Sequence, residues 1–303
     1  METLPADSLT QRLRDSRRQR QNEKILQDKE IERKTEERQE AVRERVVPGE
    51  AFLAEAGNLF GFVGRFFSRF WRRPFEAKEL VNQMDEVGTK SLVLTGVVGF
   101  SIGIVLAMQS RGTLARFGAE SFLPSMLALS VIKEIGPVLT SLVLAGRLGA
   151  GMGAELGSMK VTEQIDALEV AALKPFHYLV VTRVLACVLM FPVMTLITDF
   201  LALGGGYLEA TLADGMDIRV FVATAFDSLR FEDVVVDTMK TSVFGFIVGI
   251  VSCYLGYNVR GGTREVGRAA MQAVVISSLL ILISDVIIVR ASIMIFGDIS
   301  DAA

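Results

Sequence analysis

Residues 178–208 read YLVVTRVLACVLMFPVMTLITDFLALGGGYL, and this stretch decides the class of fold. Its charged side chains are Arg183 and Asp199. A transmembrane α-helix needs about 20 predominantly apolar residues, and this stretch is longer than that. Because a bilayer offers no water to unpaired backbone groups, an apolar stretch of this length indicates a helix that crosses a membrane.

Four further apolar segments accompany it, at residues 91–108, 122–148, 239–258 and 271–296. The sequence therefore predicts an all-α integral membrane protein with five transmembrane helices. As a helix, the segment 91–108 would be about 27 Å long, just short of a hydrocarbon core of about 30 Å. This first span is therefore expected to be tilted or re-entrant.

The charged residues gather at the start of the chain. The 303 residues are 50% hydrophobic and have a mean hydropathy of +0.41, which excludes an ordinary soluble enzyme. Residues 1–50 hold 12 basic and 12 acidic side chains and almost no large apolar ones, so they predict a solvated helix or a disordered extension. We divide the chain into this charged extension (1–50), an interfacial helix and linker (51–90) and a membrane domain (91–303).

Residues 51–73 read AFLAEAGNLFGFVGRFFSRFWRR and differ sharply from the extension. Large apolar side chains recur at helical spacing, with polar and arginine side chains on another face. The apolar positions are Phe52, Ala56, Leu59, Phe60, Val63, Phe67 and Phe70. Such a pattern is typical of a helix that lies in the headgroup region of a membrane, although a helix of a soluble core has the same periodicity. Pro74 is expected to end it.

The charges of the loops predict the orientation. The loop 258–269 has three arginines against one acid, whereas 209–238 is rich in acids. Since basic loops stay in the cytoplasm, 258–269, 149–177 and the N-terminus are expected inside and the C-terminus in the periplasm.

Several kinds of chemistry are excluded by missing residues. The sequence has no GxxxxGK[ST] motif for ATP, no nucleophile–base set, and too few His and Cys residues for a metal site or disulfide scaffold. No cofactor is expected, and the net charge of −3 gives no basis for nucleic-acid binding. The single His177 is expected at the membrane interface.

Ionisable residues inside the spans are the informative feature. A charge at the bilayer centre costs at least about 2.5–3.5 kcal/mol, so it must face protein, water or an opposite charge. Lys133, Glu134 and Lys240 are predicted to form a polar point in an apolar cavity, with Glu134 able to reach Lys240; the alternative is a purely structural ion pair. Asp199 and Asp285 form a second acidic set, interpreted as helix-packing acceptors or proton sites.

Small residues form stripes along the spans. Gly99 and Gly103 lie in the first span, and Gly245, Gly249 and Gly256 lie in the fourth. Such faces let helices approach closely, within one chain or between two.

The segment 155–175 is expected on the cytoplasmic side as a short amphipathic helix. Thr162 is its expected N-cap, and Val161, Ile165, Leu168 and Ala172 form its apolar face. This helix is interpreted either as a docking site for a soluble protein that drives transport or as a helix that rests on the membrane surface.

Three long runs resemble the permeases of the MlaE/YrbE type. They are KEIGPVLTSLVLAGRLGAGMGAELGSMKVTEQIDALEV (133–170), KPFHYLVVTRVLA (174–186) and DTMKTSVFGFIVGIVSCYLGYNVRGGTREVGRAAMQAVV (237–275). FGAESF at 117–122 is also similar, and the resemblance covers roughly residues 52–297.

The resemblance implies the membrane subunit of an ABC transporter that moves phospholipid or a related lipid between the bacterial inner membrane and the outer envelope. It implies a homodimer, a separate cytoplasmic ATPase, a periplasmic MCE-domain protein and, in some systems, a STAS-domain protein. The chain itself would not be an enzyme.

The resemblance also implies roles for particular residues. A charged cluster near the lipid cavity corresponds to Lys133, Glu134 and Lys240; Lys133 stands where the family commonly has Arg, so it keeps the charge but loses the planar fork. A coupling helix at about 161–173 would dock on the ATPase. The coupling residues are Glu155, Lys160, Glu163, Gln164, Asp166, Ala167 and Leu168.

Two other functions remain compatible with the residues. An ion-coupled secondary transporter would use Asp199 and Asp285 and would need no ATPase. An envelope scaffold without transport would not need the charged cluster.

Overall fold

The computed structural model describes residues 48–70, 77–171, 174–227 and 229–300. Most of the predicted extension, residues 1–47, therefore lies outside the described part. Trp71, Pro74 and Ala172 also lie outside it. The chain divides into two compact units, residues 1–60 and residues 61–303, and the second unit contains all the apolar spans.

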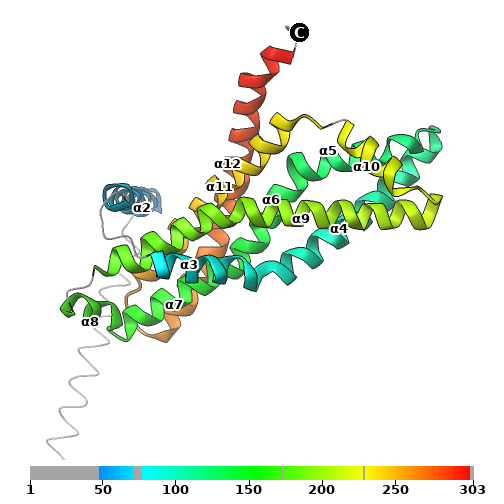
Figure 1. Cartoon of the computed structure of the whole chain (residues 1–303). Coiled ribbons are helices and arrows are strands. Elements are labelled where there is room, and N and C mark those ends of the chain that lie inside the picture. The colour runs from blue at the N-terminus through cyan, green and yellow to red at the C-terminus, as the bar shows by residue number, and fades with distance from the viewer. Residues whose placement is uncertain (1–47, 71–76, 172–173, 228, 301–303) are drawn as a thin grey trace, which may run out of the picture. The chain divides into compact units, whose positions relative to one another are not determined.

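The described residues form helices and turns without a strand (Figure 1). The predicted all-α membrane fold is thereby confirmed. The longer helices are α2 (Pro48–Phe70), α3 (Ala77–Val87), α4 (Leu92–Arg116), α5 (Leu123–Ser130), α6 (Gly136–Leu144), α7 (Ala150–Val161), α8 (Gln164–Val170), α9 (Thr182–Asp214), α10 (Ile218–Asp227), α11 (Phe231–Tyr257) and α12 (Thr263–Ser300). Two 3₁₀ turns are η1 (Thr89–Ser91) and η2 (Glu120–Phe122), and three π-helical turns are η3 (Val131–Ile135), η4 (Ala145–Gly149) and η5 (Phe176–Val181).

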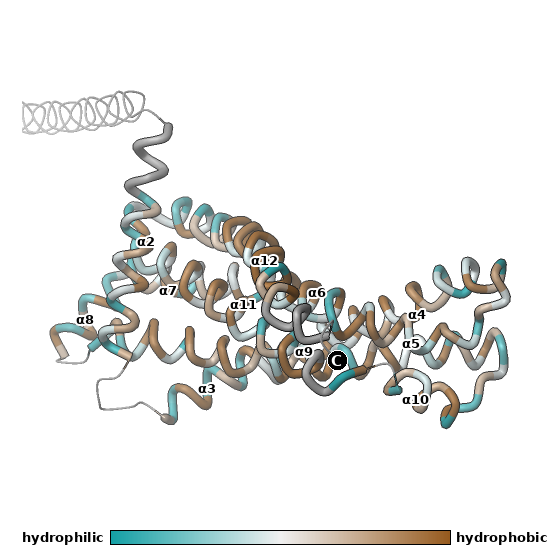
Figure 2. Tube along the Cα trace, turned by 90° about the horizontal axis from the view of Figure 1, so that it is seen from above, coloured by the Kyte–Doolittle hydropathy of each residue, from teal (hydrophilic) through white to brown (hydrophobic). Residues whose placement is uncertain are grey.

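Five stretches of the described residues are long and apolar enough to cross a membrane, which confirms the predicted number. They are 77–116, 120–161, 176–214, 234–257 and 263–294. In Figure 2 the hydrophobic colour runs along the long helices, and the hydrophilic colour gathers at the connections. The interfacial position of the N-terminal helix and the re-entrant first span stay predictions.

The first span is longer than the predicted 91–108. Helix α4 continues to Arg116, past the polar Gln109 and Arg111 where the apolar run ends. Arg111 makes paired contacts with Asp214 at the end of α9, from Nη2 to Oδ1 at 2.6 Å and from Nε to Oδ2 at 2.9 Å. This pairing lets a polar helix end continue beside its neighbour.

The second span is one long run of helix with two π-helical turns, η3 and η4. Pro137 comes directly after η3, near the start of α6. In a regular α-helix the amide of residue 137 would donate to the carbonyl of Lys133, and proline has no amide hydrogen. Residue 137 therefore donates no hydrogen bond to the Lys133 carbonyl.

Helix α2 presents two apolar sides rather than one stripe. Phe62 and Phe66 are buried, and the Phe62 ring lies 5.0 Å from that of Phe176 and 5.5 Å from that of Tyr254 between centroids. Phe67, a member of the predicted apolar stripe, is 61% exposed. Phe62 and Phe66, which lie outside the predicted stripe, thus pack on the protein, and the interfacial role of the stripe stays a prediction.

The core consists of three apolar clusters within the described residues. One joins α2, α8 and η5 to α11 through Phe62, Ile165 and Phe176. The next contains Leu144, Phe191 and Phe244, and the last contains Leu127 and Phe221 of α10. Helices α4 and α9 run side by side (Figure 1), and α9 contributes residues to all three clusters.

Candidate functional site

Lys240 of α11 is the centre of a buried charged cluster. Its Nζ donates to the Lys133 carbonyl oxygen at 2.8 Å and to Glu134 Oε2 at 3.0 Å. It also lies 3.3 Å from Asp285 Oδ1 and 3.7 Å from Asp237 Oδ1. The Lys133 carbonyl thus becomes part of the site, together with carboxylates from three helices.

Burial within the cluster is unequal. The side chain of Lys240 is 1% exposed, whereas that of Glu134 is 49% exposed. The ammonium is therefore held inside the bundle and compensated by carboxylates, as a buried charge requires. Glu134 remains the accessible member, so a ligand entering from the surface would meet its carboxylate first.

The structure divides the second acidic set differently from the sequence. Asp285 pairs with Lys240, so it belongs to the charged cluster. Asp199 lies against Gly136, where an added Cβ would be 1.7 Å from Asp199 Oδ1. That oxygen is buried and has no hydrogen-bond partner among the described residues. The sequence signal that could have found Asp285 is its depth: an acid in mid-span needs a cation, and Lys240 is one of few available.

Lys133 enters the cluster through its backbone. Its carbonyl oxygen accepts from Lys240, and its side chain is half-buried. The sequence predicts a role for the ammonium of this residue, and that role stays a prediction.

The predicted coupling helix is α8, which is shorter than the expected 161–173. Glu163 precedes it with a left-handed backbone (φ 58°), and no side chain caps the helix. The predicted cap at Thr162 is wrong, because its hydroxyl donates instead to the Ser158 carbonyl at 2.8 Å. Ile165 is buried in the first core cluster and Leu168 packs partly against it, so they attach the helix to its own chain.

The other coupling candidates differ in their surroundings. Glu163, Gln164, Asp166 and Ala167 are exposed. Lys160 Nζ donates to Asp166 Oδ1 at 2.9 Å and so fixes α8 to α7. Glu155 accepts from Arg183 Nη2 at 2.7 Å, and this arginine is 3% exposed. The Nη1 atom of Arg183 also donates a hydrogen bond to the Leu179 carbonyl at 2.9 Å. Arg183 was not assigned a role from sequence, yet it joins the end of the second span to the start of the third. His177, expected at the membrane interface, is buried.

The glycines of the predicted small-residue stripes face other helices of the same chain. A Cβ at Gly103 would lie 1.8 Å from the Ala202 carbonyl oxygen, and one at Gly245 would lie 2.6 Å from that of Cys187. Gly99, Gly249 and Gly256 are similarly close to Thr198, Val184 and Gly153. These contacts leave no room for a side chain where α4 and α11 pack on α9 and α7.

No group of three or more His, Cys, Asp or Glu side chains that could hold a metal ion is found in the described part of the chain. The contacts of Lys240 with Glu134 and Asp285 form an ion-pair network within an apolar bundle.

The model of the family described as "Permease MlaE" matches residues 80–291. This chain belongs to the MlaE permease family. The match includes all or most of each of the five spans, and it contains both the charged cluster and α8. It confirms the resemblance drawn from residues 133–170 and 237–275.

Curated relatives agree with this assignment. A probable ABC transporter permease protein of Rickettsia typhi is 40% identical over 230 residues, which are 76% of this chain and 88% of that protein. A probable ABC transporter permease protein of Synechocystis is 34% identical over 75% of this chain and 86% of its own length. The chloroplastic protein TRIGALACTOSYLDIACYLGLYCEROL 1 of Arabidopsis thaliana is 32% identical over 75% of this chain and 65% of that protein. This MlaE permease is thus the membrane-spanning subunit of an ABC transporter, a role that implies a separate ATPase.

Proposed function

We propose that this MlaE permease carries phospholipid, or a related lipid, between the bacterial inner membrane and the outer envelope. The observation that carries the proposal is the Lys240–Glu134–Asp285 cluster, a compensated charge network in an otherwise apolar bundle. A lipid has both kinds of chemistry, with acyl chains for the apolar helices and a charged headgroup for an accessible carboxylate. The name of the Arabidopsis relative, which contains that of a glycolipid, supports a lipid cargo.

The energy for transport comes from a separate ATPase that docks on α8. The exposed side chains of Glu163, Gln164, Asp166 and Ala167 would form the contact, while Ile165 anchors the helix to the bundle. The anchoring supports this role, since a helix fixed at one face can transmit a push received at the other. Glu155 and Lys160 of α7 hold the neighbouring helices in place: Glu155 pairs with Arg183 of α9, and Lys160 pairs with Asp166 of α8.

The assembly we propose is a homodimer in the inner membrane, with the N-terminus and α8 in the cytoplasm and the C-terminus in the periplasm. Its further partners would be a periplasmic MCE-domain protein and, in some assemblies, a STAS-domain protein. The arginine-rich loop between α11 and α12 supports the orientation, because basic loops remain in the cytoplasm. We retain the division into the extension 1–50, the interfacial region 51–90 and the permease domain 91–303.

The proposal is tested by purifying the full chain together with its ATPase and identifying bound lipid by mass spectrometry. We expect bound phospholipid and ATP hydrolysis that phospholipid stimulates. Glu134→Gln should lower both while the protein still inserts in the membrane. Glu120→Gln, an exposed acid outside the cluster, is the matched control. A chain that purifies without an ATPase and without lipid above the detergent background contradicts the proposal.

A further inference from the structure

A second polar region lies between α3 and α7, far from the Lys240 cluster. It is a cavity of about 730 Å³. Its lining includes Asn82, Glu86, Lys90, Arg147 and Glu155, over an apolar floor that contains Met152. Arg147 is 14 residues from Lys133 along nearly continuous helix, which corresponds to about 21 Å. The two sites are therefore separate.

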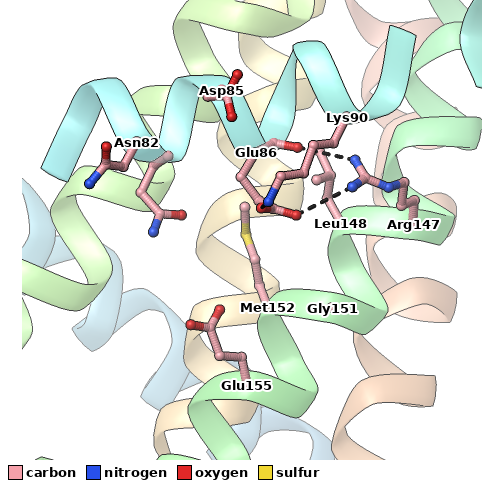
Figure 3. A pocket seen from close by; sticks show the side chains of 10 residues that line it. Asn82, Asp85, Glu86, Lys90, Arg147, Leu148, Gly151, Met152 and Glu155 are labelled. Carbon is pink, nitrogen blue, oxygen red and sulfur yellow. Dashed lines mark hydrogen bonds and ion pairs between the residues drawn. The ribbon is translucent and has the colours of Figure 1, made fainter. Parts of the chain in front are cut away.

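The inner end of the cavity carries both signs of charge, with Lys90 and Arg147 beside Glu86 and Asp85. Glu86 Oε1 lies 3.3 Å from Arg147 Nη2, and Glu86 Oε2 pairs with Lys90. Arg147 also donates to the Glu86 carbonyl at 3.1 Å and to the Ser91 hydroxyl. Two cations thus share one carboxylate. Figure 3 shows the contacts from Glu86 to Arg147 as dashed lines. Since the Lys90 side chain is 56% exposed, its remaining donors are accessible to an anion.

The other end of the cavity offers a carboxylate. Glu155 projects from α7 on the side away from Arg147 (Figure 3). Its Oε1 accepts from Arg183, and its side chain is 56% exposed. Eight residues of helix separate it from Arg147, about 12 Å along the axis. Because Glu155 is nearer to α8, its carboxylate lies on the proposed cytoplasmic side of Lys90 and Arg147.

An apolar surface begins where the cavity ends. Two residues after Lys90, helix α4 starts with exposed Leu92, Val93 and Leu94, and Val97 continues this face one turn later. A molecule with its polar part in the cavity could therefore extend apolar chains along α4. That combination fits a membrane lipid better than a water-soluble solute.

We propose that this cavity binds the headgroup of a zwitterionic phospholipid with a primary amine, of the phosphatidylethanolamine kind, from the cytoplasmic leaflet. The phosphate accepts hydrogen bonds from Lys90, and the ammonium donates to Glu155. Arg147 is a positioning residue that holds Glu86 and the wall of the cavity. The site deepens the proposed lipid transport, on which it rests, by adding a binding point at the leaflet opposite to the proposed outer exit.

The test is photocrosslinking of the full chain in nanodiscs that contain equal amounts of phosphatidylethanolamine and phosphatidylcholine with the same acyl chains. Asn82→p-benzoylphenylalanine places the probe in the lining. Mass spectrometry of the crosslinked peptide identifies the headgroup. We expect phosphatidylethanolamine to dominate, because the quaternary amine of the other lipid has no hydrogen to donate to Glu155.

Variants then separate the site from general lipid contact. Lys90→Glu should lower the crosslinking of both lipids about tenfold, the order expected for one lost hydrogen bond to a charged group, and Lys90→Gln should lower it by less. Lys78→Glu, at an exposed position of α3 outside the lining, should leave the crosslinking unchanged. Equal crosslinking of the two lipids, or crosslinking that survives Lys90→Glu, overturns the site.

Two further results separate this site from the proposed function. If the chain retains phospholipid that Glu134→Gln removes, while the crosslinks at position 82 show no preference, the cavity assignment fails and lipid transport stands. If no phospholipid is bound at all, both fail. Displacement of the crosslinked lipid by soluble glycerophosphoethanolamine at equal concentration would show a solute site and also overturn the assignment.

Discussion

Replacing Gly103 with alanine tests the close approach of α4 to α9. The added Cβ would lie 1.8 Å from the carbonyl oxygen of Ala202 and 2.6 Å from its carbonyl carbon. Ordinary contact begins at 3.4 Å, so the helices must separate by about 1.6 Å. Since both obstructing atoms belong to the backbone, no side-chain rotation can relieve the clash.

The expected loss of stability is the balance of two opposing terms. Overpacking of a tight contact costs about 1–3 kcal/mol, and a backbone clash belongs at the upper end. Replacing glycine with alanine within a helix stabilises the folded state by up to about 1 kcal/mol, because alanine has the higher helix propensity. The net loss is about 2 kcal/mol. In a protein of this size about 1 kcal/mol shifts the unfolding midpoint by about 2–4 °C, so we expect a decrease of about 4–8 °C.

The two cysteines of the chain provide the assay. Cys187 and Cys253 are both free and buried, so a thiol-reactive fluorophore labels the chain as it unfolds on heating. Gly112→Ala is the control, because it lies on the same helix and an added Cβ there meets nothing within 4 Å. Its midpoint should stay the same or rise slightly. Equal midpoints for the two variants would refute the close packing of α4 on α9.

Three other substitutions probe the charged cluster and α8. Lys240→Met leaves Asp285 buried without its cation and should cost about 3–5 kcal/mol in the same thermal assay. Pro137→Ala supplies an amide to the Lys133 carbonyl, so it should raise the unfolding midpoint while lowering lipid-stimulated ATP hydrolysis in the assembled transporter. Ala167→Arg places a bulky charge on the exposed face of α8 and should abolish that stimulated hydrolysis without changing the midpoint.

Each of these substitutions has a matched control. Lys240→Arg keeps the charge and should recover part of the lost stability. Pro124→Ala lies in the first turn of α5, where no helical donor is missing, so it should change the hydrolysis little. Ala115→Arg is exposed at the other end of the bundle and should leave hydrolysis intact. If each control behaves like its test variant, the residue-specific reasoning is wrong.

The number of spans was predictable because it depends on the length of apolar runs alone. Membrane-crossing helices must satisfy every backbone group internally, so a long apolar run leaves one structural solution. The ends of the helices were less predictable. Helix α4 extends to Arg116 because Asp214, 103 residues beyond Arg111, pairs with that arginine. A partner so distant in sequence leaves no local signal.

The charged cluster was partly predictable for an energetic reason. A lysine buried in a membrane needs an acid, and Glu134 was the acid favoured from sequence. To assign Asp285 as well, one must know which face of α12 points toward Lys240, and the hydropathy of the sequence does not define that orientation. The π-helical turns were missed because they depend on backbone bonding, not on composition. The Thr162 cap was misassigned because its hydroxyl had an alternative acceptor in the preceding turn.

The second span gives these features a common mechanical basis. From Glu134 to Val161 the chain is helical throughout, so about 40 Å of continuous structure connects the charged cluster to the start of α8. Rigid helix transmits displacement, and the π-helical turns η3 and η4 are the points where its hydrogen bonding departs from the regular pattern. Glu134 lies in the first turn and Arg147 in the second. A push on α8 by the ATPase of the proposed transporter would therefore change the geometry first at the residues that hold the cavity wall and then at those that hold Lys240.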